Sequence, residues 1–226
     1  MVGMETENPY PVQRETVKNR KEGGEVTLFF EVYMDKSFKE RVKSQLISSA
    51  KLYFEHLVCN DYLIYSKNFK YQKYYLVSAK KDNFLHLTGV RTNLKANEFF
   101  EKCFEGTLTE EDFDLGSKQQ KGLIRRKISV LDKAIMIFST TNITVEENFE
   151  KNRISCSFAS ADKSCTIGFT KTRLAKPQTV LKGNRLNTEV EIDVILSKTK
   201  DSQHFEKIIQ NKIGYSLEEL NLLFGL

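Results

Sequence analysis

The spacing of apolar residues divides the chain into helical and extended parts. In three stretches of the first 138 residues, apolar side chains recur every three or four positions, which is the period of an amphipathic helix. The helices predicted from this period cover residues 37–58, 93–105 and 118–138. Ser37 stands where a side chain would cap the first helix, and Gly106 follows the second in the position of a helix stop.

Runs with a period of two predict strands. After residue 139, apolar and polar residues alternate over three runs, and Asp162 lies in the turn between the first two. These predicted strands cover residues 153–160, 164–171 and 188–197. Shorter apolar runs predict three earlier strands, at 26–34, 71–78 and 84–87.

The order of these elements indicates an α+β fold. N-terminal helices would pack on a mostly antiparallel sheet of four or more strands, followed by a C-terminal helical tail. We expect the tail to hold one helix at 202–213 and another after Ser216. Residues 1–24 lack the apolar stretch of a secretory signal and are expected to form a flexible leader. One domain is then expected over 25–200, with the helical tail over 201–226.

Composition narrows the class of protein further. Of the 226 residues, 40% are hydrophobic, and no stretch reaches the roughly 20 apolar residues of a membrane helix. The cysteines show neither C-x-x-C pairs nor metal-ligand spacing, and the last three fall at apolar positions. They are Cys59, Cys103, Cys156 and Cys165. We therefore expect a reduced cytoplasmic protein without disulfides, zinc, cofactor or membrane anchor.

Basic residues are concentrated in one part of the chain. The net charge is only +5, but residues 117–185 contain 14 Lys and Arg against 5 Asp and Glu. Such an excess is an electrostatic footprint for a polyanion, while a solvated lysine-rich surface is the alternative. We expect the positive potential to be greatest where the helix at 118–138 approaches residues 164–182.

One histidine stands out among three. His56 and His204 lie near predicted helix ends and are expected to be exposed. His86 lies in the apolar run 84–87, two residues before Thr88, and a strand would place both side chains on the same face. The alternative is a structural histidine beside a turn.

Basic and polar residues that could meet this pair lie in two later segments. Lys118, Lys121 and Arg125 border the apolar stripe of the third predicted helix. Lys171 and Arg173 form a basic end to the predicted strand at 164–171, and a polar pair follows the only proline of the folded body. The candidates for nucleic-acid binding are Lys118, Lys121, Arg125, Gln178, Thr179 and Lys182. We expect His86, Thr88 and at least one of Arg125, Lys171 and Arg173 to converge on one pocket.

The available chemistry excludes several classes of enzyme. The sequence contains no P-loop, no G-x-S-x-G, no G-x-G-x-x-G and no H-x-x-H metal motif. Histidine, hydroxyl, lysine and arginine side chains suit RNA cleavage without a metal. A base then activates the 2′-hydroxyl against its own phosphate, and cations stabilise the developing charge.

Several short motifs occur in an order that resembles a known family. They are Phe84–Val90 (FLHLTGV), Phe99-Phe100, Ile167-Gly168-Phe169 and Pro177–Leu181 (PQTVL). Together they are similar to the fourth subfamily of phage-encoded barnase–EndoU–colicin–RelE-like nuclease domains. The resemblance covers about residues 37–197 and leaves the leader and the C-terminal helices unexplained.

The resemblance implies a fold, an activity and site residues. It implies N-terminal helices on a four-stranded antiparallel sheet and a metal-independent ribonuclease of phage or mobile-element conflict systems. RNA would be the substrate, and a neutralising protein a further partner. By matched position, His86 and Thr88 are the candidate active-site pair, with Thr179 weaker. In our interpretation His86 transfers the proton, Thr88 binds the phosphate, and Lys171 or Arg173 stabilises the transition state.

Two other functions remain open from the sequence. An ADP-ribosyltransferase-like enzyme also places a histidine and a hydroxyl residue on an early strand, and would need a glutamate such as Glu191 facing His86. The other alternative is a non-catalytic module on the same scaffold that binds nucleic acid or inhibits a protein.

Overall fold

The structure is a computed structural model that describes residues 25–141, 143–151 and 153–225, with side chains from residue 38 onward. The leader expected at residues 1–24 lies outside the described residues. The chain divides into two units, 1–37 and 38–226, and the fold below is that of the second.

The first of two five-stranded sheets has the strand order β12-β11-β1-β2-β8. Its strands are β1 (Asn60–Tyr65), β2 (Tyr75–Ser78), β8 (Leu174–Ala175), β11 (Val194–Thr199) and β12 (Lys207–Asn211). Neighbouring strands are antiparallel, except that β2 and β8 run parallel, with Leu76 opposite Leu174 and Val77 opposite Ala175.

The second sheet has the order β10-β3-β6-β7-β9 and is antiparallel throughout. Its strands are β3 (Thr144–Glu147), β6 (Phe158–Ala161), β7 (Cys165–Phe169), β9 (Pro177–Lys182) and β10 (Val190–Glu191). A separate two-stranded ribbon joins β4 (Glu150–Lys151) to β5 (Ile154–Ser155). Asp162 makes the β6–β7 turn, because its Oδ1 accepts from the backbone N–H groups of Ser164 and Cys165, both at 2.7 Å.

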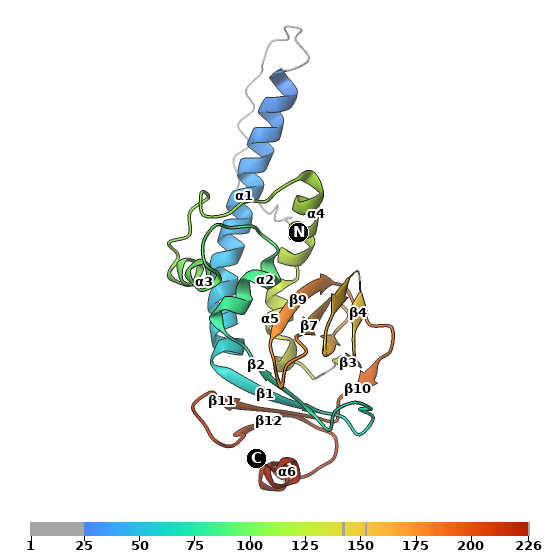
Figure 1. The fold of residues 1–226 in the computed structure, drawn as a ribbon. Helices are drawn as coiled ribbons and strands as arrows, with labels where there is room; N and C mark the ends of the chain where they lie inside the picture. Colours follow the sequence, from blue (N-terminus) through green and yellow to red (C-terminus); the bar gives the residue numbers. More distant parts are fainter. Residues whose placement is uncertain (1–24, 142, 152, 226) are drawn as a thin grey trace, which may run out of the picture. The chain divides into compact units, whose positions relative to one another are not determined.

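Helices cover the faces of these sheets. The long ones are α1 (Glu25–Tyr53), α3 (Ala96–Glu105), α4 (Lys118–Ile128) and α6 (Leu217–Phe224). The short ones are η1 (Phe54–Val58), η2 (Lys81–Asn83), α2 (Phe84–Thr88), α5 (Leu131–Ile135) and η3 (Ile137–Ser139). In Figure 1, α6 lies on the other side of β11 and β12 from α2 and α3.

The first sheet is apolar on both faces because both faces are covered. Tyr62 and Ile64 of β1 belong to the main core with the helices, whereas Leu63 between them belongs to a smaller cluster with Leu220 and Phe224 of α6. Since successive strand residues point to opposite faces, such a strand reads as a continuous apolar run. The sequence therefore gives no alternation from which β1 could be predicted.

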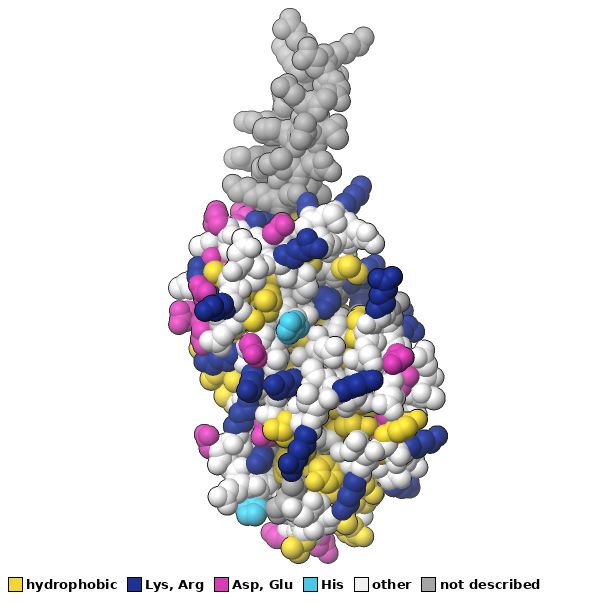
Figure 2. Space-filling view, in the orientation of Figure 1, with side chains coloured by type: hydrophobic (Ala, Val, Ile, Leu, Met, Phe, Trp, Pro, Cys, Tyr) yellow, Lys and Arg dark blue, Asp and Glu magenta, His cyan; other side chains and the backbone are white. Residues whose placement is uncertain are grey.

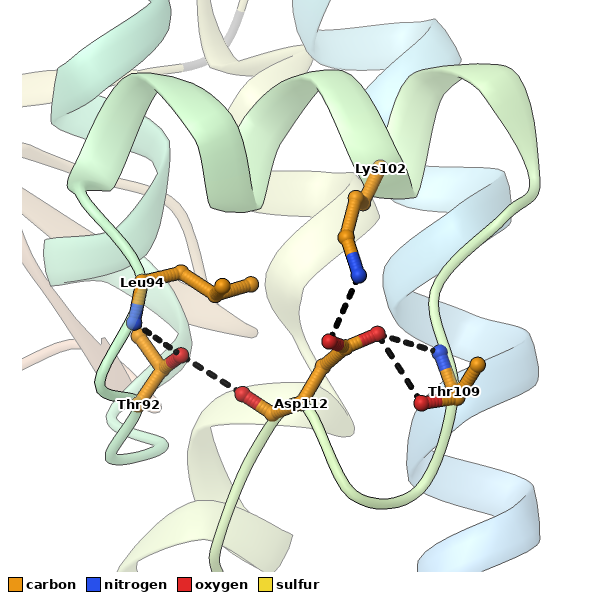
Figure 3. A network of polar contacts seen from close by, with 5 residues as sticks. All are labelled: Thr92, Leu94, Lys102, Thr109 and Asp112. Atoms are coloured by element: carbon orange, nitrogen blue, oxygen red, sulfur yellow. Dashed lines mark hydrogen bonds and ion pairs between the residues drawn. The ribbon is translucent and has the colours of Figure 1, made fainter.

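The connection between α3 and α4 is held by one carboxylate. Asp112 accepts from Lys102 Nζ at 2.7 Å through Oδ1, and from the N–H and hydroxyl of Thr109 at 2.7 and 3.0 Å through Oδ2 (Figure 3). Its carbonyl accepts from the Thr92 hydroxyl at 2.6 Å, and that hydroxyl accepts from Leu94 N–H. Hydrogen bonds from Lys102 and Thr109 lower the pKa of Asp112.

The predicted α+β class with a C-terminal helix is confirmed, but the strands form two sheets. Residues 188–197 contribute to both of them, through β10 in the second and β11 in the first. The hairpin of β6 and β7 is confirmed, and so is the cap of α6, where Ser216 Oγ accepts from Glu219 N–H at 3.2 Å. The prediction of a strand at 71–78 is correct only from Tyr75 onward.

Two predicted strands are helical. Residues 26–34 lie inside α1, which passes through Ser37 without interruption, so Ser37 is no cap. Residues 84–87 are part of α2, in which Phe84, Leu87 and Thr88 are buried and His86 is exposed. A short apolar run fits either period, and burial at i, i+3 and i+4 identifies the helix.

Two predicted helices also need correction. The helix at 118–138 is broken, since α4 ends at Ile128 and α5 begins only at Leu131, although the predicted face is buried at Ile124 and Phe138. The helix at 202–213 is wrong, because β12 pairs there with β11. Pairing with a neighbouring strand outweighs a weak helical pattern.

Helix ends agree better with the sequence. The first helical stretch ends at Val58, and α3 ends at Glu105 with Gly106 in the left-handed conformation at φ 77°. Helix α3 begins at Ala96 rather than at Asn93. No helix in the described part of the chain is long and apolar enough to span a membrane.

Candidate nucleic-acid cleft

Two carboxylates fix the loop between β1 and β2. Asp193 Oδ2 accepts from Lys67 N–H at 2.7 Å. Glu147, at the end of β3, accepts from Lys70 N–H at 2.6 Å and from Tyr71 N–H at 3.2 Å. It also accepts from the Tyr75 hydroxyl at 2.8 Å. The loop is therefore attached to both sheets through charged hydrogen-bond acceptors, which are stronger than neutral ones.

Threonine hydroxyls shape the segment from Thr170 to Lys176, where the chain crosses from the second sheet to the first and back. Thr170 Oγ1 accepts from Lys176 N–H at 3.0 Å and lies 2.8 Å from Thr172 Oγ1. The Thr172 hydroxyl in turn lies 2.7 Å from the carbonyl of Leu174, the first residue of β8. This short crossing presents Lys171 and Arg173 to solvent.

The parallel pairing of β2 and β8 brings these two segments together. In a parallel pair, the residues before each strand lie at the same end. The loop before β2 and the crossing before β8 therefore form the walls of a cleft of about 690 Å³, which we call the tyrosine cleft. It is lined by Tyr71, Gln72, Lys73, Tyr74, Tyr75, Leu76, Asn148, Ser157, Lys171, Thr172 and Arg173.

The lining of the tyrosine cleft is aromatic and basic, and it contains no Asp or Glu. Within the described residues, the side chains of Lys171 and Arg173 form no ion pair or hydrogen bond, so their charges face solvent. Lys73 instead donates to the carbonyl of Leu223 at 2.8 Å and lies 5.9 Å from the centre of the Phe224 ring. Two unpaired cations beside tyrosines suit a ligand that carries both phosphates and flat rings.

Burial keeps the neighbouring groups protonated. The pKa of Tyr75 lies well above its usual range because of burial and the Glu147 carboxylate. Burial also raises the pKa of the Cys156 thiol to about 11, although the charge of Lys171 acts in the opposite direction. The Cys156 thiol lies 3.6 Å from Oε1 of Gln178, a predicted binding residue that does not line the cleft.

His86 and Thr88 do not form the predicted pair. The strand that would have put them on one face is a helix, and Thr88 is fully buried, whereas His86 is exposed. The Thr88 hydroxyl donates to Leu85 carbonyl at 2.8 Å and accepts from Val90 N–H at 3.3 Å. It thus closes the end of α2. Neither His86 nor Thr88 lines the tyrosine cleft.

Lys127, which the sequence analysis did not single out, contacts the backbone of His86. Lys127 of α4 donates to the His86 carbonyl at 3.1 Å, and burial lowers its pKa to about 8. Helix α2 also packs against β9, the strand that carries Gln178, Thr179 and Lys182. Of these three, Thr179 is buried and Lys182 is exposed.

The predicted basic residues of α4 differ in exposure and do not lie in one site. Lys118 is exposed and Lys121 is half-buried. Arg125 lies over the Phe38 ring, with its guanidinium carbon 4.9 Å from the ring centre, in a separate groove between α1 and α4. Figure 2 shows Lys and Arg side chains spread over much of one face of the molecule, interspersed with hydrophobic ones. Among the predicted site residues, only Lys171 and Arg173 line the tyrosine cleft.

Other features bear on the alternatives. The residues that the structure describes contain no group of three or more His, Cys, Asp and Glu side chains suited to hold a metal ion. Glu191, the residue that an ADP-ribosyltransferase would need opposite a strand histidine, forms a 3.0 Å ion pair with Lys212. Since His86 is not on a strand, the pattern that suggested this alternative is absent.

A comparison with protein families identifies the family of this chain. The model of the family described as phage-Barnase-EndoU-ColicinE5/D-RelE like nuclease 4 matches residues 45–221. The chain belongs to this nuclease family. Every residue that lines the tyrosine cleft lies inside the matched range, and a nucleic acid is the substrate class of such a family. No curated protein and no solved structure matches the chain significantly.

The sequence reasoning found the cations of the cleft but missed its tyrosines and the carboxylate that holds them. Tyr71 and Tyr74 lie in a run that was predicted as a strand, and Glu147 was not singled out. The one available signal was the run YQKYY at residues 71–75, which holds three tyrosines around one lysine. Such interleaving of aromatic and basic residues is typical of single-strand nucleic-acid binding.

Proposed function

We propose that this protein is a ribonuclease that binds and cleaves RNA in the tyrosine cleft. The observation that supports the proposal best is the pair of exposed, unpaired cations, Lys171 and Arg173, in a cleft without carboxylates. The backbone that carries them before β8 is held by hydrogen bonds of the crossing segment. Two cations that are carried by a fixed backbone into one cleft can stabilise the negative charge that develops on a phosphorane.

The proposed reaction is an internal transesterification. The 2′-oxygen attacks the adjacent phosphorus and loses its proton to a base, while the bond from phosphorus to the 5′-oxygen breaks and that oxygen gains a proton. The products are a 2′,3′-cyclic phosphate and a 5′-hydroxyl end. Lys171 and Arg173 would stabilise the negative charge on the phosphoryl oxygens in the transition state.

We retain His86 as the proposed carrier of the proton. Its ring is exposed, and its backbone is held by Lys127 from α4. Because His86 does not line the tyrosine cleft, this role requires RNA that extends from the cleft across α2, or a movement of α2. The two sites are therefore tested separately.

The test compares RNA cleavage by four proteins. The variants are Lys171→Ala combined with Arg173→Ala, His86→Ala, and the control Lys163→Ala, which removes an exposed lysine from the β6–β7 turn. Loss of the two cations should slow cleavage by about 100-fold or more. Loss of a proton-transfer group should slow it by about 100-fold. The control should cleave at the wild-type rate.

The substrate decides between kinds of nuclease. A DNA strand of the same sequence, which lacks the 2′-hydroxyl, should resist cleavage. The RNA products should carry 2′,3′-cyclic phosphate ends, and cleavage should persist in EDTA. Equal cleavage by the wild type and the two-cation variant would refute the cleft as the active site. Equal cleavage by the wild type and His86→Ala would refute only the proposed role of His86.

The biological setting is part of the same proposal. The word phage in the family description supports a role in conflict between a mobile element and its host, and RNA as substrate implies the cytoplasm. A neutralising protein would have to cover a basic cleft, so we expect its contact surface to be acidic.

A further inference from the structure

Three tyrosines line the cleft, and only one of them has a ring without an aromatic neighbour. The Tyr75 ring packs on Phe158 with centroids 4.4 Å apart, and the Tyr74 ring packs on Phe224 with centroids 5.4 Å apart. Among the described residues, the Tyr71 ring has no such partner, and Tyr71 is 63% exposed. An exposed aromatic ring within a binding cleft is a surface on which a flat ligand can stack.

The backbone that carries this ring is fixed. The N–H groups of Lys70 and Tyr71 both donate to Glu147, and the preceding Phe69 ring packs edge-on against Tyr75 with centroids 5.2 Å apart. The ring therefore stays exposed because its own loop is held away from the core, and not because the loop lacks contacts. A ligand that stacks on Tyr71 loses less conformational entropy than it would on a mobile loop.

We infer that Tyr71 stacks on an unpaired base and that the substrate of the cleft is single-stranded. Unpaired bases can be splayed out and offer a free face, whereas bases inside a duplex are covered on both faces. The phosphates on either side of the stacked base would lie against Lys171 and Arg173 on the opposite wall. This inference rests on the proposed function, since it assumes that the cleft binds nucleic acid.

The experiment measures binding without cleavage. The probe is a 2′-O-methyl RNA strand of about eight nucleotides, within the site size of single-strand binding folds, with one 2-aminopurine base whose fluorescence falls on stacking. The same strand annealed to its complement is the duplex probe. The proteins are wild type, Tyr71→Ala, Tyr71→Phe and the control Tyr215→Ala, which removes a 48% exposed tyrosine that does not line the cleft.

Loss of the stacking ring should weaken single-strand binding by roughly 5- to 150-fold and abolish the 2-aminopurine quenching. Tyr71→Phe should retain both, because the ring face is kept. Tyr215→Ala should bind as the wild type does. Duplex binding should be weaker than single-strand binding and equal in all four proteins. Because Tyr71 is exposed, its truncation should leave the melting temperature unchanged.

Two outcomes overturn the inference. One is a Tyr71→Ala variant that binds and quenches the single strand as the wild type does, and the other is a duplex that binds as tightly as the single strand. The Lys171→Ala and Arg173→Ala double variant separates this failure from failure of the proposed function. If it binds the single strand as the wild type does, the cleft is not the nucleic-acid site. If it loses binding while Tyr71→Ala does not, only the stacking inference is wrong.

Discussion

Replacing Glu147 with glutamine should loosen the loop that forms one wall of the tyrosine cleft. The carboxylate accepts three hydrogen bonds, from the backbone N–H groups of Lys70 and Tyr71 and from the Tyr75 hydroxyl. Glutamine has almost the same shape but only one acceptor oxygen, and its NH₂ group would face a donor. The substitution therefore changes hydrogen bonding and charge without creating a cavity.

The expected loss of stability depends on which of the three hydrogen bonds the glutamine can still accept. The glutamine oxygen can keep the 2.6 Å bond from Lys70, and the Tyr75 hydroxyl can rotate to accept from the new NH₂ group. The N–H of Tyr71 then loses its acceptor, and the remaining hydrogen bonds no longer involve a charged carboxylate. Since hydrogen bonds to charged groups contribute about 1.5–3 kcal/mol each, we expect the free energy of unfolding to fall by about 2 kcal/mol. For a domain of this size that corresponds to a melting temperature lower by about 4–8 °C.

The measurement needs a control with the same change of charge. Glu150, three residues along the chain, accepts a single 3.1 Å hydrogen bond from the exposed Ser155 hydroxyl. Glu150→Gln should change the free energy of unfolding by no more than about 0.5 kcal/mol, as is usual for surface substitutions. Urea unfolding of both variants gives the comparison, and hydrogen exchange reports the amides of Lys70 and Tyr71 directly.

In Glu147→Gln, these two amides should exchange faster while amides of the buried strands β6 and β7 lose protection only in proportion to global stability. Single-strand binding should also show reduced 2-aminopurine quenching, because the Tyr71 ring is no longer held. If Glu147→Gln and Glu150→Gln unfold alike, and the Tyr71 amide keeps its protection, the loop does not depend on this carboxylate.

Two further substitutions test the fold around the site. Asp112→Asn should lower the free energy of unfolding by about 1–2 kcal/mol at pH 7, since the amide keeps one acceptor oxygen, turns an NH₂ donor toward Lys102 or Thr109 and loses the negative charge beside Lys102. The pKa of Asp112 is lowered in the folded state, so its contribution is present above the unfolded pKa and is lost as pH falls through the folded one. Urea unfolding at pH 7 and pH 3 should show a smaller deficit of the variant at pH 3 than at pH 7. Gly89→Ala should lower the free energy of unfolding more than Gly106→Ala. Both glycines have φ 77°, but a Cβ at Gly89 would lie 2.9 Å from Lys127 Cδ, whereas a Cβ at Gly106 would meet no atom within 4 Å. In both variants, an alanine in the left-handed conformation lowers the free energy of unfolding by about 1–2 kcal/mol. Equal melting temperatures of the two variants would exclude a contribution from the Lys127 contact.

Local signals in the sequence predicted local structure. The Ser216 cap of α6, the Asp162 turn and the Gly106 helix stop were all predicted, because each depends on hydrogen bonds or backbone angles within a few residues. The predicted strand at 84–87 failed for a related reason. Four apolar residues satisfy either period, and only the core that they face shows that Phe84 and Leu87 point the same way.

The site could be predicted only in part. Lys171 and Arg173 were chosen because they follow a strand in a basic region, and both line the cleft. The loop that faces them is held by Glu147, which lies more than seventy residues away along the chain. Nothing in the local sequence of Tyr71 distinguishes an exposed ring on a fixed loop from a buried ring in a strand. A single sequence therefore identifies one wall of the cleft and not the other.

The parallel pair of β2 and β8 explains why such a site arises in this fold. Antiparallel neighbours place the start of one strand beside the end of the other, so the approaches to two such strands lie at opposite ends. Here the chain leaves the second sheet after Phe169, adds two residues to the first sheet beside β2 and returns at Pro177. Both approaches then lie at one end, and the tyrosine loop faces the cations. Since β8 contributes only Leu174 and Ala175 to the sheet, the threonine hydrogen bonds before it must supply much of the rigidity of the backbone that carries Lys171 and Arg173.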